Sequence, residues 1–483
     1  MSVILDGRSL SLDELIRVSR SADRVEISRD AIARMAIHRE VCERASARGD
    51  RVYGLTTGVG ARKDTGLDRA RTHVFNRSLI LNCRVGTGAP ASIEAVRATM
   101  VCLLNLLLSG LPGVRPELAL IIARALNHQQ HPVMRTRGSV GQGDLTPLAD
   151  LAQGLFLANG SELAAGEGLA LVDNNAFATA IAAGAMHDCK QLLDALDAVG
   201  ALELEAFAAN LDIIHPLAEQ RPFVGLLETL RRLRVLLAGS ALHEPGGARN
   251  LQDPLSYRCL PQVHGGARDA LGFALGQVAT ELNAAQNNPL VSLEEDRLVP
   301  VASFEILPLA TALDLTRIAL APVLTCALER MIKLLHPAFS GLRGGLAVGP
   351  DAASDGFNEF AVAGQAVAAE ARLLAQPVSY ELVSTSAAEG IEDRTTMAPL
   401  AARRLAEMVD LAHELAAMEL AVASRALSLR ATGLGEGTSR VQRMVTEVIG
   451  EPQPGAEVPA DLQPLQHLIS SGALGSVVGP CSV

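Results

Sequence analysis

A glycine-rich stretch near the N-terminus begins with a tyrosine that could do acid–base chemistry. It reads Tyr53-Gly-Leu-Thr-Thr-Gly-Val-Gly60. Glycines let the backbone turn sharply and approach a ligand closely. A tyrosine at the start of such a loop can serve as an acid or a base when its pKa is lowered. Taken alone, the stretch fits a packed tyrosine in a glycine turn better than a catalytic loop.

A second glycine-rich stretch is followed by a helix start. It reads Gly138-Ser-Val-Gly-Gln-Gly-Asp-Leu-Thr-Pro-Leu-Ala149. Thr146 is a good N-cap and Pro147 suits the first helical position. Such a loop would bring backbone N–H groups to a helix N-terminus, where negative charge is stabilised. The spacing matches neither the Walker nor the Rossmann pattern, so a tight turn feeding a capped helix is the simpler interpretation.

A third stretch carries an arginine suited to a carboxylate. It runs from Gln252 to Gly265 and contains Arg258, whose planar guanidinium matches a carboxylate group. A structural salt bridge explains this arginine equally well. Cys259 follows Arg258, and Cys83 precedes another arginine, but we expect both cysteines to be buried thiols, because a sequence neighbour alone does not lower a thiol pKa.

Composition narrows the class of protein. The chain has 483 residues, a net charge of −11, 3% aromatic residues and no Trp. These values argue against binding to nucleic acid or to an anionic membrane. The seven Cys form no Cys-x-x-Cys pair, which favours reduced thiols in the cytoplasm. No His or Cys group has metal-ligand spacing, so we expect no metal. The N-terminus shows no signal-peptide pattern.

Helical patterning dominates the rest of the chain. Long helices are predicted over 28–48, 92–110, 116–127, 175–208, 223–238, 267–285, 304–335, 357–375 and 398–430. Several of them are apolar on more than one face, which is typical of a bundle core or of a subunit interface. Short strands are predicted near 3–5, 162–172 and 291–301. Loops are expected at 53–66, 135–147, 243–266, 287–303 and 340–355, with a surface loop around 450–461.

Taken together, the three stretches resemble the histidine, phenylalanine and tyrosine ammonia-lyases. The family pattern Tyr-Gly-x-x-Thr-Gly-x-Gly is matched at 53–60, Gly-Ser-Val-Gly…Asp-Leu-x-Pro-Leu at 138–148, and Gln-Asp-x-x-Ser-x-Arg-Cys-x-Pro-Gln-Val at 252–263. Weaker similarities follow at Asn287-Asn-Pro-Leu290, Ala369-Glu-Ala-Arg372, Thr385-Ser-Ala, Glu392-Asp393 and Met397-Ala-Pro399. The matches keep the family's order over nearly the whole chain.

The resemblance implies a mainly α fold of the histidine ammonia-lyase-like (fumarase/aspartase-like) type. It implies a cytoplasmic homotetramer with active sites assembled from several subunits, acting on a small amino-acid-like substrate. It also implies loss of ammonia without an external cofactor. We divide the chain into a smaller loop-rich N-terminal part, 1–205, and a long helical bundle with C-terminal helices, 206–483.

The sequence departs from the family at the residues that form the electrophile. In the family, an Ala-Ser-Gly tripeptide cyclises to methylidene-imidazolone (MIO), whose alkene arises when the Ser loses water. Here the run reads Val140-Gly-Gln-Gly-Asp144, one residue shorter, and Gln142 has no hydroxyl or thiol to eliminate. We therefore expect no MIO and no other cofactor.

Other positions that match the family's site have also changed. A His position falls at Cys83, an Asn position at Asp173, a second Tyr position at Leu255, and the triplet Asn-Phe-His reads Ser303-Phe304-Glu305. Tyr53, Gln252, Arg258, Phe304 and Glu370 are retained. The family pattern thus makes Tyr53, Asp173, Glu305 and Glu370 the candidate catalytic residues. It makes Cys83, Gln142, Gln252, Arg258 and Phe304 the candidate substrate-binding residues.

The substitutions add carboxyl groups and remove an imidazole and a phenol. If Asp173 and Glu305 line one pocket, it can hold a cationic substrate group, and two nearby carboxyls raise one pKa toward neutrality. The leading hypothesis is an MIO-independent elimination, addition or cyclisation on an amino-acid-like carboxylate. One alternative is a true ammonia-lyase that deaminates an amino acid. Another is a non-catalytic ligand-binding or hetero-oligomer paralogue, although unpaired buried acids would be costly in a dead pocket.

Overall fold

Helices form most of the chain. The structure, a computed structural model, describes residues 2–349, 356–380, 387–430, 432–450 and 458–479. The long helices lie close to the ranges predicted from the apolar patterning. The prediction of a mainly α protein is therefore confirmed.

The chain divides into two compact units, each assembled from three segments. The first unit comprises Met1–Ala185, Ala274–Leu313 and Pro377–Arg403, and the second comprises Met186–Phe273, Asp314–Gln376 and Arg404–Val483. Four of the divisions fall inside long helices: α8 (Ala176–Phe207), α11 (Leu260–Glu281), α12 (Leu307–Leu335) and α16 (Ala398–Arg430). The sequence-based division has one boundary, after residue 205, whereas the compact units interleave along the chain.

The first unit combines short helices with three pairs of strands. Its helices are α1 (Leu12–Arg20), α2 (Arg29–Arg48), α3 (Thr72–Cys83), α4 (Ile93–Leu108), α5 (Pro116–Asn127), α6 (Leu145–Ala152), α7 (Glu167–Val172) and α15 (Ala387–Gly390). Strands β1 (Ser2–Leu5) and β2 (Arg24–Ile27) pair in parallel. The pairs β3 (Thr87–Pro90) with β4 (Arg135–Arg137), and β5 (Leu290–Ser292) with β6 (Arg297–Val299), are antiparallel.

Buried apolar faces and local caps explain the main helices of this unit. Helix α4 buries every residue from Val96 to Leu108, and the Ser92 side chain accepts a hydrogen bond from the Ala95 N–H at its start. Helix α2 ends at Gly49, which adopts the left-handed conformation that glycine tolerates best. Both ends agree with the sequence prediction.

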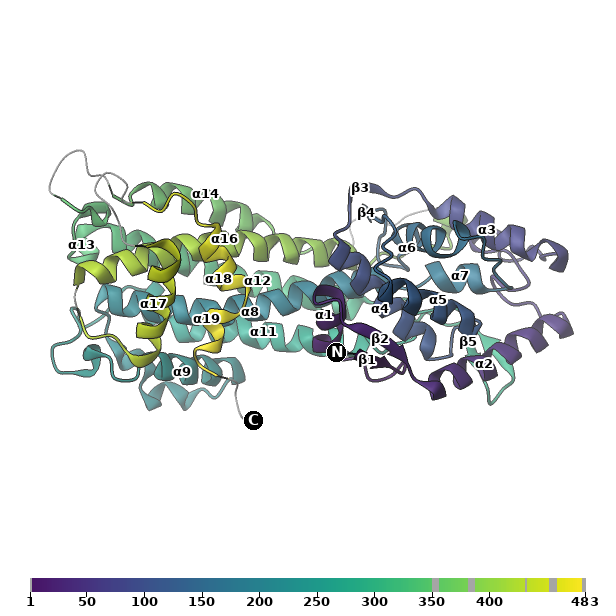
Figure 1. Cartoon of the computed structure of the whole chain (residues 1–483), viewed down its shortest axis with the longest axis horizontal. Helices are drawn as coiled ribbons and strands as arrows, with labels where there is room; N and C mark the ends of the chain where they lie inside the picture. The colour runs from purple at the N-terminus through teal and green to yellow at the C-terminus, as the bar shows by residue number, and fades with distance from the viewer. Residues whose placement is uncertain (1, 350–355, 381–386, 431, 451–457, 480–483) are drawn as a thin grey trace. The chain divides into compact units, whose positions relative to one another are not determined.

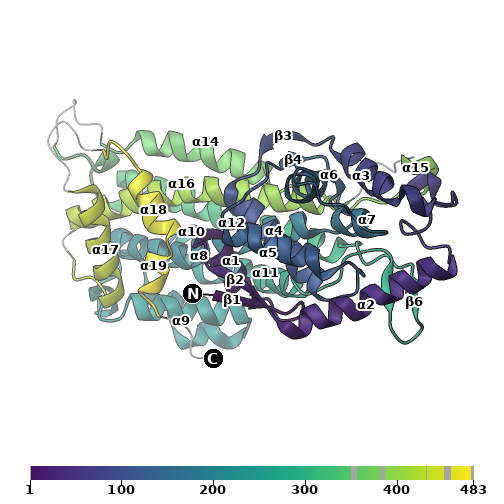
Figure 2. The ribbon, with the colours of Figure 1, turned by 45° about the vertical axis from the view of Figure 1, so that its right-hand side comes forward.

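The second unit is built on a bundle of long helices. Segments of α8, α11, α12 and α16 lie alongside one another with α14 (Glu359–Leu373), as the two ribbon views agree (Figures 1 and 2). The remaining helices are α9 (Val224–Leu236), α10 (Leu255–Arg258), α13 (Pro337–Ser340), α17 (Glu436–Ile449), α18 (Gln463–Ser470) and α19 (Ala473–Ser476). Helices that are apolar all round bury every face in such a bundle.

Two predicted segments have different structures. The predicted strand 162–172 contains helix α7 and no strand. Its run Leu169–Val172 is buried on all sides, and a short apolar run of this kind does not distinguish a buried strand from a buried helix. The predicted loop 243–266 contains α10 and the start of α11, because Pro254 and Pro261 precede or begin helical turns there.

The predicted cap at Thr146 is also wrong. Helix α6 begins two residues earlier than predicted, with Asp144 as its N-cap, so Thr146 lies inside the first turn. Most of the predicted surface loop around 450–461 and the end of the predicted loop 340–355 lie outside the described residues.

One helical stretch meets the length and composition criteria for a membrane span. It runs from Glu167 to Phe207, and 83% of its most apolar window is buried inside the protein. The core helix of a bundle passes the same test, and the packing of α8 fits that description.

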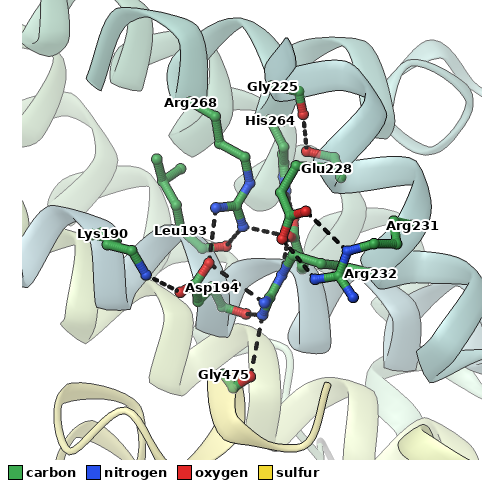
Figure 3. A network of polar contacts seen from close by, with 12 residues as sticks. Lys190, Leu193, Asp194, Gly225, Glu228, Arg231, Arg232, His264, Arg268 and Gly475 are labelled. Carbon is green, nitrogen blue, oxygen red and sulfur yellow. Dashed lines mark hydrogen bonds and ion pairs between the residues drawn. The ribbon is translucent and has the colours of Figure 1, made fainter. Parts of the chain in front are cut away.

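A network of buried charges joins three helices and the C-terminal segment of the second unit (Figure 3). Asp197 on α8 accepts hydrogen bonds from His264 Nδ1 (2.9 Å), Arg232 Nε (2.9 Å) and Arg268. Arg232 also donates to the Gly475 carbonyl on α19 at 3.4 Å. Burial alone would raise the pKa of Asp197, but the neighbouring Arg268, His264 and Arg232 hold it well below its usual range. Asp197 is thus an ionised centre for several elements.

We predict that Asp197→Asn destabilises the protein by roughly 3–5 kcal/mol, because it leaves two guanidinium groups without their shared buried counter-charge. The measurement is the free energy of unfolding from denaturant titration at pH 7. Asp64→Asn is the matched control, since the Asp64 side chain is 75% exposed and should change stability by less than about 0.5 kcal/mol. Equal effects of the two substitutions would contradict the role of the network.

Candidate active site

Tyr53 lies at the start of a tight turn in the first unit and is half-buried. Its phenol oxygen accepts a hydrogen bond from the Gly60 N–H at 2.9 Å, so the turn folds back onto its own first residue. Gly54 has φ +68°, and a Cβ there would lie 2.3 Å from Leu169 Cδ2. Burial raises the pKa of Tyr53, and the carboxylates of Asp173 and Glu392 raise it further, while the Gly60 N–H opposes them. The phenol therefore keeps its proton in the free protein at neutral pH.

Asp173 ends helix α7 and is buried. The Asn287 side-chain N–H group donates to the Asp173 carbonyl at 3.0 Å and to the Ala170 carbonyl at 2.9 Å, which holds this helix end in place. A Cβ on Gly143 would lie 2.8 Å from Asp173 Oδ1, so the carboxyl packs directly against the glycine loop. Burial, and then the charge of Glu392, raise the pKa of Asp173 to about 7.

Cys83 and Glu392 complete an electrostatically coupled group with Tyr53 and Asp173. Cys83 is the last residue of α3, and burial, followed by the charges of Glu392 and Asp173, raises the pKa of its thiol. A Cβ on Gly60 would lie 3.7 Å from Glu392 Oε1, which puts this carboxylate beside the Tyr53 turn. Four separate parts of the chain thus supply one phenol, one thiol and two carboxyl groups.

Glu392 is a site residue that sequence reasoning did not select. The signal was present, because Glu392-Asp393 is one of the weaker family similarities that precede Met397-Ala-Pro399. Its neighbourhood became visible only in the folded chain.

Gln142 and Glu305, two candidates far apart in sequence, are brought together. They form an isolated antiparallel bridge, and Gln142 Nε2 donates to Glu305 Oε2 at 2.5 Å. Arg394 Nη2 also lies 3.4 Å from Glu305 Oε2, and the Leu307 N–H donates to Oε1 at 3.0 Å. Both oxygens of Glu305 are engaged by the protein, so this carboxylate anchors the glycine loop in the free structure.

The glycine loop is tethered on both sides of Gln142. Thr396 Oγ1 donates to the Gly141 carbonyl at 2.7 Å, and the Gly143 N–H donates to Asn175 Oδ1 at 3.1 Å. Asn175 in turn donates to the Phe304 carbonyl at 2.6 Å. Phe304 thus meets the loop through its backbone. Sequence reasoning missed Asn175 and Thr396, because nothing in their local sequence indicates which backbone groups they would reach.

Asp144 fastens the end of the same loop to α8. It is fully buried, its Oδ1 accepts from Ser139 Oγ at 2.6 Å, and its Oδ2 accepts from the Ala178 N–H at 2.7 Å. Burial raises the pKa of Asp144 to about 6 despite these donors. Buried hydrogen bonds from Ser139 and Ala178 to Asp144 therefore hold the end of the loop.

The remaining candidates lie in the second unit. Gln252 and Arg258 are exposed and line a polar pocket of about 630 Å³. The pocket is also lined by Asn210, Asp212, Ile213, His215, Leu217, Ala218, Leu251, Asp253 and Gln262. Glu370 is exposed on α14 and is not among the residues of this pocket. In the part of the chain that is described, no group of three or more His, Cys, Asp or Glu is placed to hold a metal ion.

The sequence matches the family of aromatic amino acid lyases over residues 10–161 and 158–449. Two relatives named histidine ammonia-lyase are each 33% identical to the chain. For the protein of Alkaliphilus metalliredigens, the match covers 91% of this chain and 90% of the relative. For that of Stigmatella aurantiaca, it covers 98% and 97%.

Solved structures of related enzymes share the fold. Ergothionase of Treponema denticola, an ergothioneine-degrading enzyme solved with desmethyl-ergothioneine sulfonic acid, superimposes with a TM-score of 0.90 at 29% identity, covering 98% of this chain and 99% of that one. Histidine ammonia-lyase of Trypanosoma cruzi gives 0.88 at 27% identity, covering 99% and 95%. With its three motifs in order and near-complete coverage of these relatives, the chain belongs to the aromatic amino acid lyase family and is a carbon–nitrogen lyase-like enzyme.

Proposed function

We propose that the chain catalyses an elimination, or a related addition or cyclisation, on an amino-acid-like carboxylate, without MIO. The observation that carries this proposal is Gln142, which stands where the family electrophile arises and has no β-leaving group. Without a hydroxyl or a thiol, its side chain has nothing to expel to become an alkene.

The loop geometry supports the same proposal. Cyclisation would require the nitrogen of Gly143 to attack the carbonyl carbon of Gly141. In the structure, that N–H donates to Asn175 and that carbonyl accepts from Thr396, while Gln142 between them pairs with Glu305. These atoms do not fit ring formation, and the proposed reaction uses no step through MIO.

The two carboxyl groups beside Tyr53 favour a substrate with a positive charge. Asp173 and Glu392 together raise the pKa of the Tyr53 phenol, and a cationic group bound next to them would oppose that effect. When such a substrate binds, the Tyr53 phenol releases its proton to solvent and becomes a base, and the Gly60 N–H stabilises the phenolate oxygen. Substrate charge would thus activate the base only in the complex.

The elimination follows from these groups. The Tyr53 phenolate removes a proton from the carbon next to the one that carries the leaving group. The electrons of that C–H bond form the new C=C bond, and the electrons of the C–N bond leave with the amine. Ammonia leaves poorly without the electrophile, whereas a quaternary ammonium group departs as a neutral tertiary amine and needs no proton. We therefore propose a leaving group of this cationic kind.

Arg258 provides the site for the substrate carboxylate in this proposal. Its guanidinium is exposed in a polar pocket, and a planar guanidinium binds a carboxylate through two parallel hydrogen bonds. The resemblance to the ammonia-lyases implies active sites assembled from several subunits, and we propose a cytoplasmic homotetramer in which Arg258 binds the substrate carboxylate. Gln252 in the same pocket is the proposed neighbour of the carboxylate.

A second candidate is the deamination of an amino acid, which the relatives named histidine ammonia-lyase favour. It would use Asp173, whose pKa is raised to about 7, to protonate the departing amine. The likeness to an ergothioneine-degrading enzyme favours a less common substrate. A first panel should therefore contain ergothioneine, histidine, tyrosine and their N-trimethylated forms, followed by mass spectrometry of the products.

We predict that the intact mass of the purified chain shows no loss of two waters. A family member that carries Ala-Ser-Gly is the positive control for that loss. A deficit of two waters located by peptide mapping to residues 140–144 would refute the MIO-independent proposal, whatever the substrate.

We predict that alkylation of Cys83 reports the charge of its neighbours. Removing a carboxylate with Asp173→Asn or Glu392→Gln should lower the pKa of the Cys83 thiol, so iodoacetamide should react faster than with the wild type at pH 8. Peptide mapping follows Cys83 against Cys326 as the internal reference, and Asp64→Asn is the charge-matched control. If the alkylation rate of Cys83 is unchanged in both variants, Asp173 and Glu392 do not lie close enough to act on its thiol.

We predict that Tyr53→Phe lowers kcat on any accepted substrate by about 10²–10⁴-fold, the usual contribution of a general base. We predict that kcat/KM for a cationic substrate rises with pH through about 7, because Asp173, whose pKa is raised to about 7, must lose its proton to attract the cation. Asp173→Asn should abolish this inflection in the pH profile of kcat/KM. An identical inflection in that variant would assign the titration to another group.

A further inference from the structure

A second cluster of buried charges lies outside the candidate active site, in the bundle of the second unit. Glu203 on α8, Arg330 on α12 and Glu419 on α16 all have fully buried side chains. Arg330 donates through Nε to Glu203 Oε2 and through Nη2 to Glu419 Oε1, the latter at 2.8 Å. One guanidinium therefore serves two carboxyl groups.

If both carboxyl groups are ionised, two of their four oxygens have no hydrogen-bond donor in the described part of the chain. Glu203 Oε1 and Glu419 Oε2 are buried and accept no hydrogen bond from the residues that the structure describes. Yet the two side chains are within hydrogen-bonding reach of each other. Two carboxylates repel and cannot form a hydrogen bond with each other, whereas one added proton supplies a donor between the two side chains.

Among the described residues, no cation other than Arg330 forms an ion pair with either carboxyl group of the cluster. Of the described residues, Tyr257, Cys326 and His264 interact electrostatically with the cluster, and Asp253 and Arg430 interact with Tyr257. Burial lowers the pKa of His264, which therefore stays neutral. A second ionised carboxylate would thus remain uncompensated in the interior, which is costly by several kcal/mol.

We propose that Glu203 and Glu419 share a single buried proton, carried by Glu203 and donated to Glu419. The cluster is then one carboxylic acid, one carboxylate and one guanidinium, with no net charge. Burial, and then the charge of Glu419, keep the pKa of Glu203 well above its usual range. The proton therefore stays bound at neutral pH.

The neutral cluster holds the segment that ends in Arg258. Arg330 Nη1 donates to the Ser256 carbonyl at 3.3 Å, and Tyr257 OH donates to the Arg330 carbonyl at 2.9 Å. The Tyr257 ring is fully buried and stacks on Phe207, with ring centroids 4.1 Å apart. Arg330 is thus a positioning residue for Arg258. This second step rests on the proposed carboxylate-binding role of Arg258, whereas the shared proton does not.

Glu203→Gln tests the proton directly, because its amide N–H can replace the proposed acid O–H. Folded wild type would hold a proton that the unfolded chain loses above about pH 4.3. Its stability should therefore fall, relative to the variant, as pH rises from 5 to 9, with a slope difference of one proton. The measurement is the melting temperature of both proteins across this range. Glu436→Gln, at an exposed residue of α17, is the matched control.

Further variants test how many negative charges Arg330 needs, and they separate the shared proton from the positioning of Arg258. Glu419→Gln should also be tolerated at pH 7, whereas the double glutamine variant leaves Arg330 without an anion and should melt well below either single variant. Arg330→Lys should speed amide hydrogen exchange over residues 255–258 by losing the contact with Ser256. A difference between wild type and Glu203→Gln that does not change with pH would overturn the shared proton. Unchanged exchange in Arg330→Lys would overturn the positioning step alone.

Discussion

The candidate active site is organised around one glycine loop that is held by hydrogen bonds on both sides. Gly141 and Gly143 are committed through their backbone groups to Thr396 and Asn175, and Gln142 is paired with Glu305. The loop can run this close to Asp173 only because Gly143 has no Cβ. A hydrogen-bonded turn of this kind supports the groups around it, and we propose that the nearby phenol and carboxyl groups carry out the chemistry.

Buried carboxyl groups have lowered or raised pKa values according to the number of cations around them. In the bundle, Asp197 is surrounded by guanidinium groups and its carboxyl pKa falls, whereas Glu203 shares one guanidinium with Glu419 and its pKa rises. Beside Tyr53, Asp173 forms no ion pair with any residue that the structure describes, and its pKa rises to about 7. Ion-paired charges thus hold the helices of the bundle together, while Asp173 and Glu392 lie beside the phenol that we propose as the base.

Several features were predictable from local patterns. The long helices followed from apolar runs with few breaks, and Gly49 marked the end of α2 by its conformational freedom. Local patterns failed where tertiary packing decided between alternatives. The run Leu169–Val172 is buried on all sides, a pattern that fits a strand or a helix equally, and the structure shows a helix. Helix α6 begins at Leu145, and Asp144, rather than Thr146, is the residue bonded to Ser139 and α8.

The sequence alone determined the family motifs, the mainly α character and the lack of an eliminable side chain at Gln142, because these depend on residue type and order. Only the tertiary structure decided which groups meet. It placed Glu392 beside Tyr53, bonded Gln142 to Glu305 and buried the carboxyl group of Asp173. The reason is physical: a carboxyl pKa and a hydrogen-bond partner depend on solvent exclusion and on distances between segments more than a hundred residues apart, which no local pattern encodes.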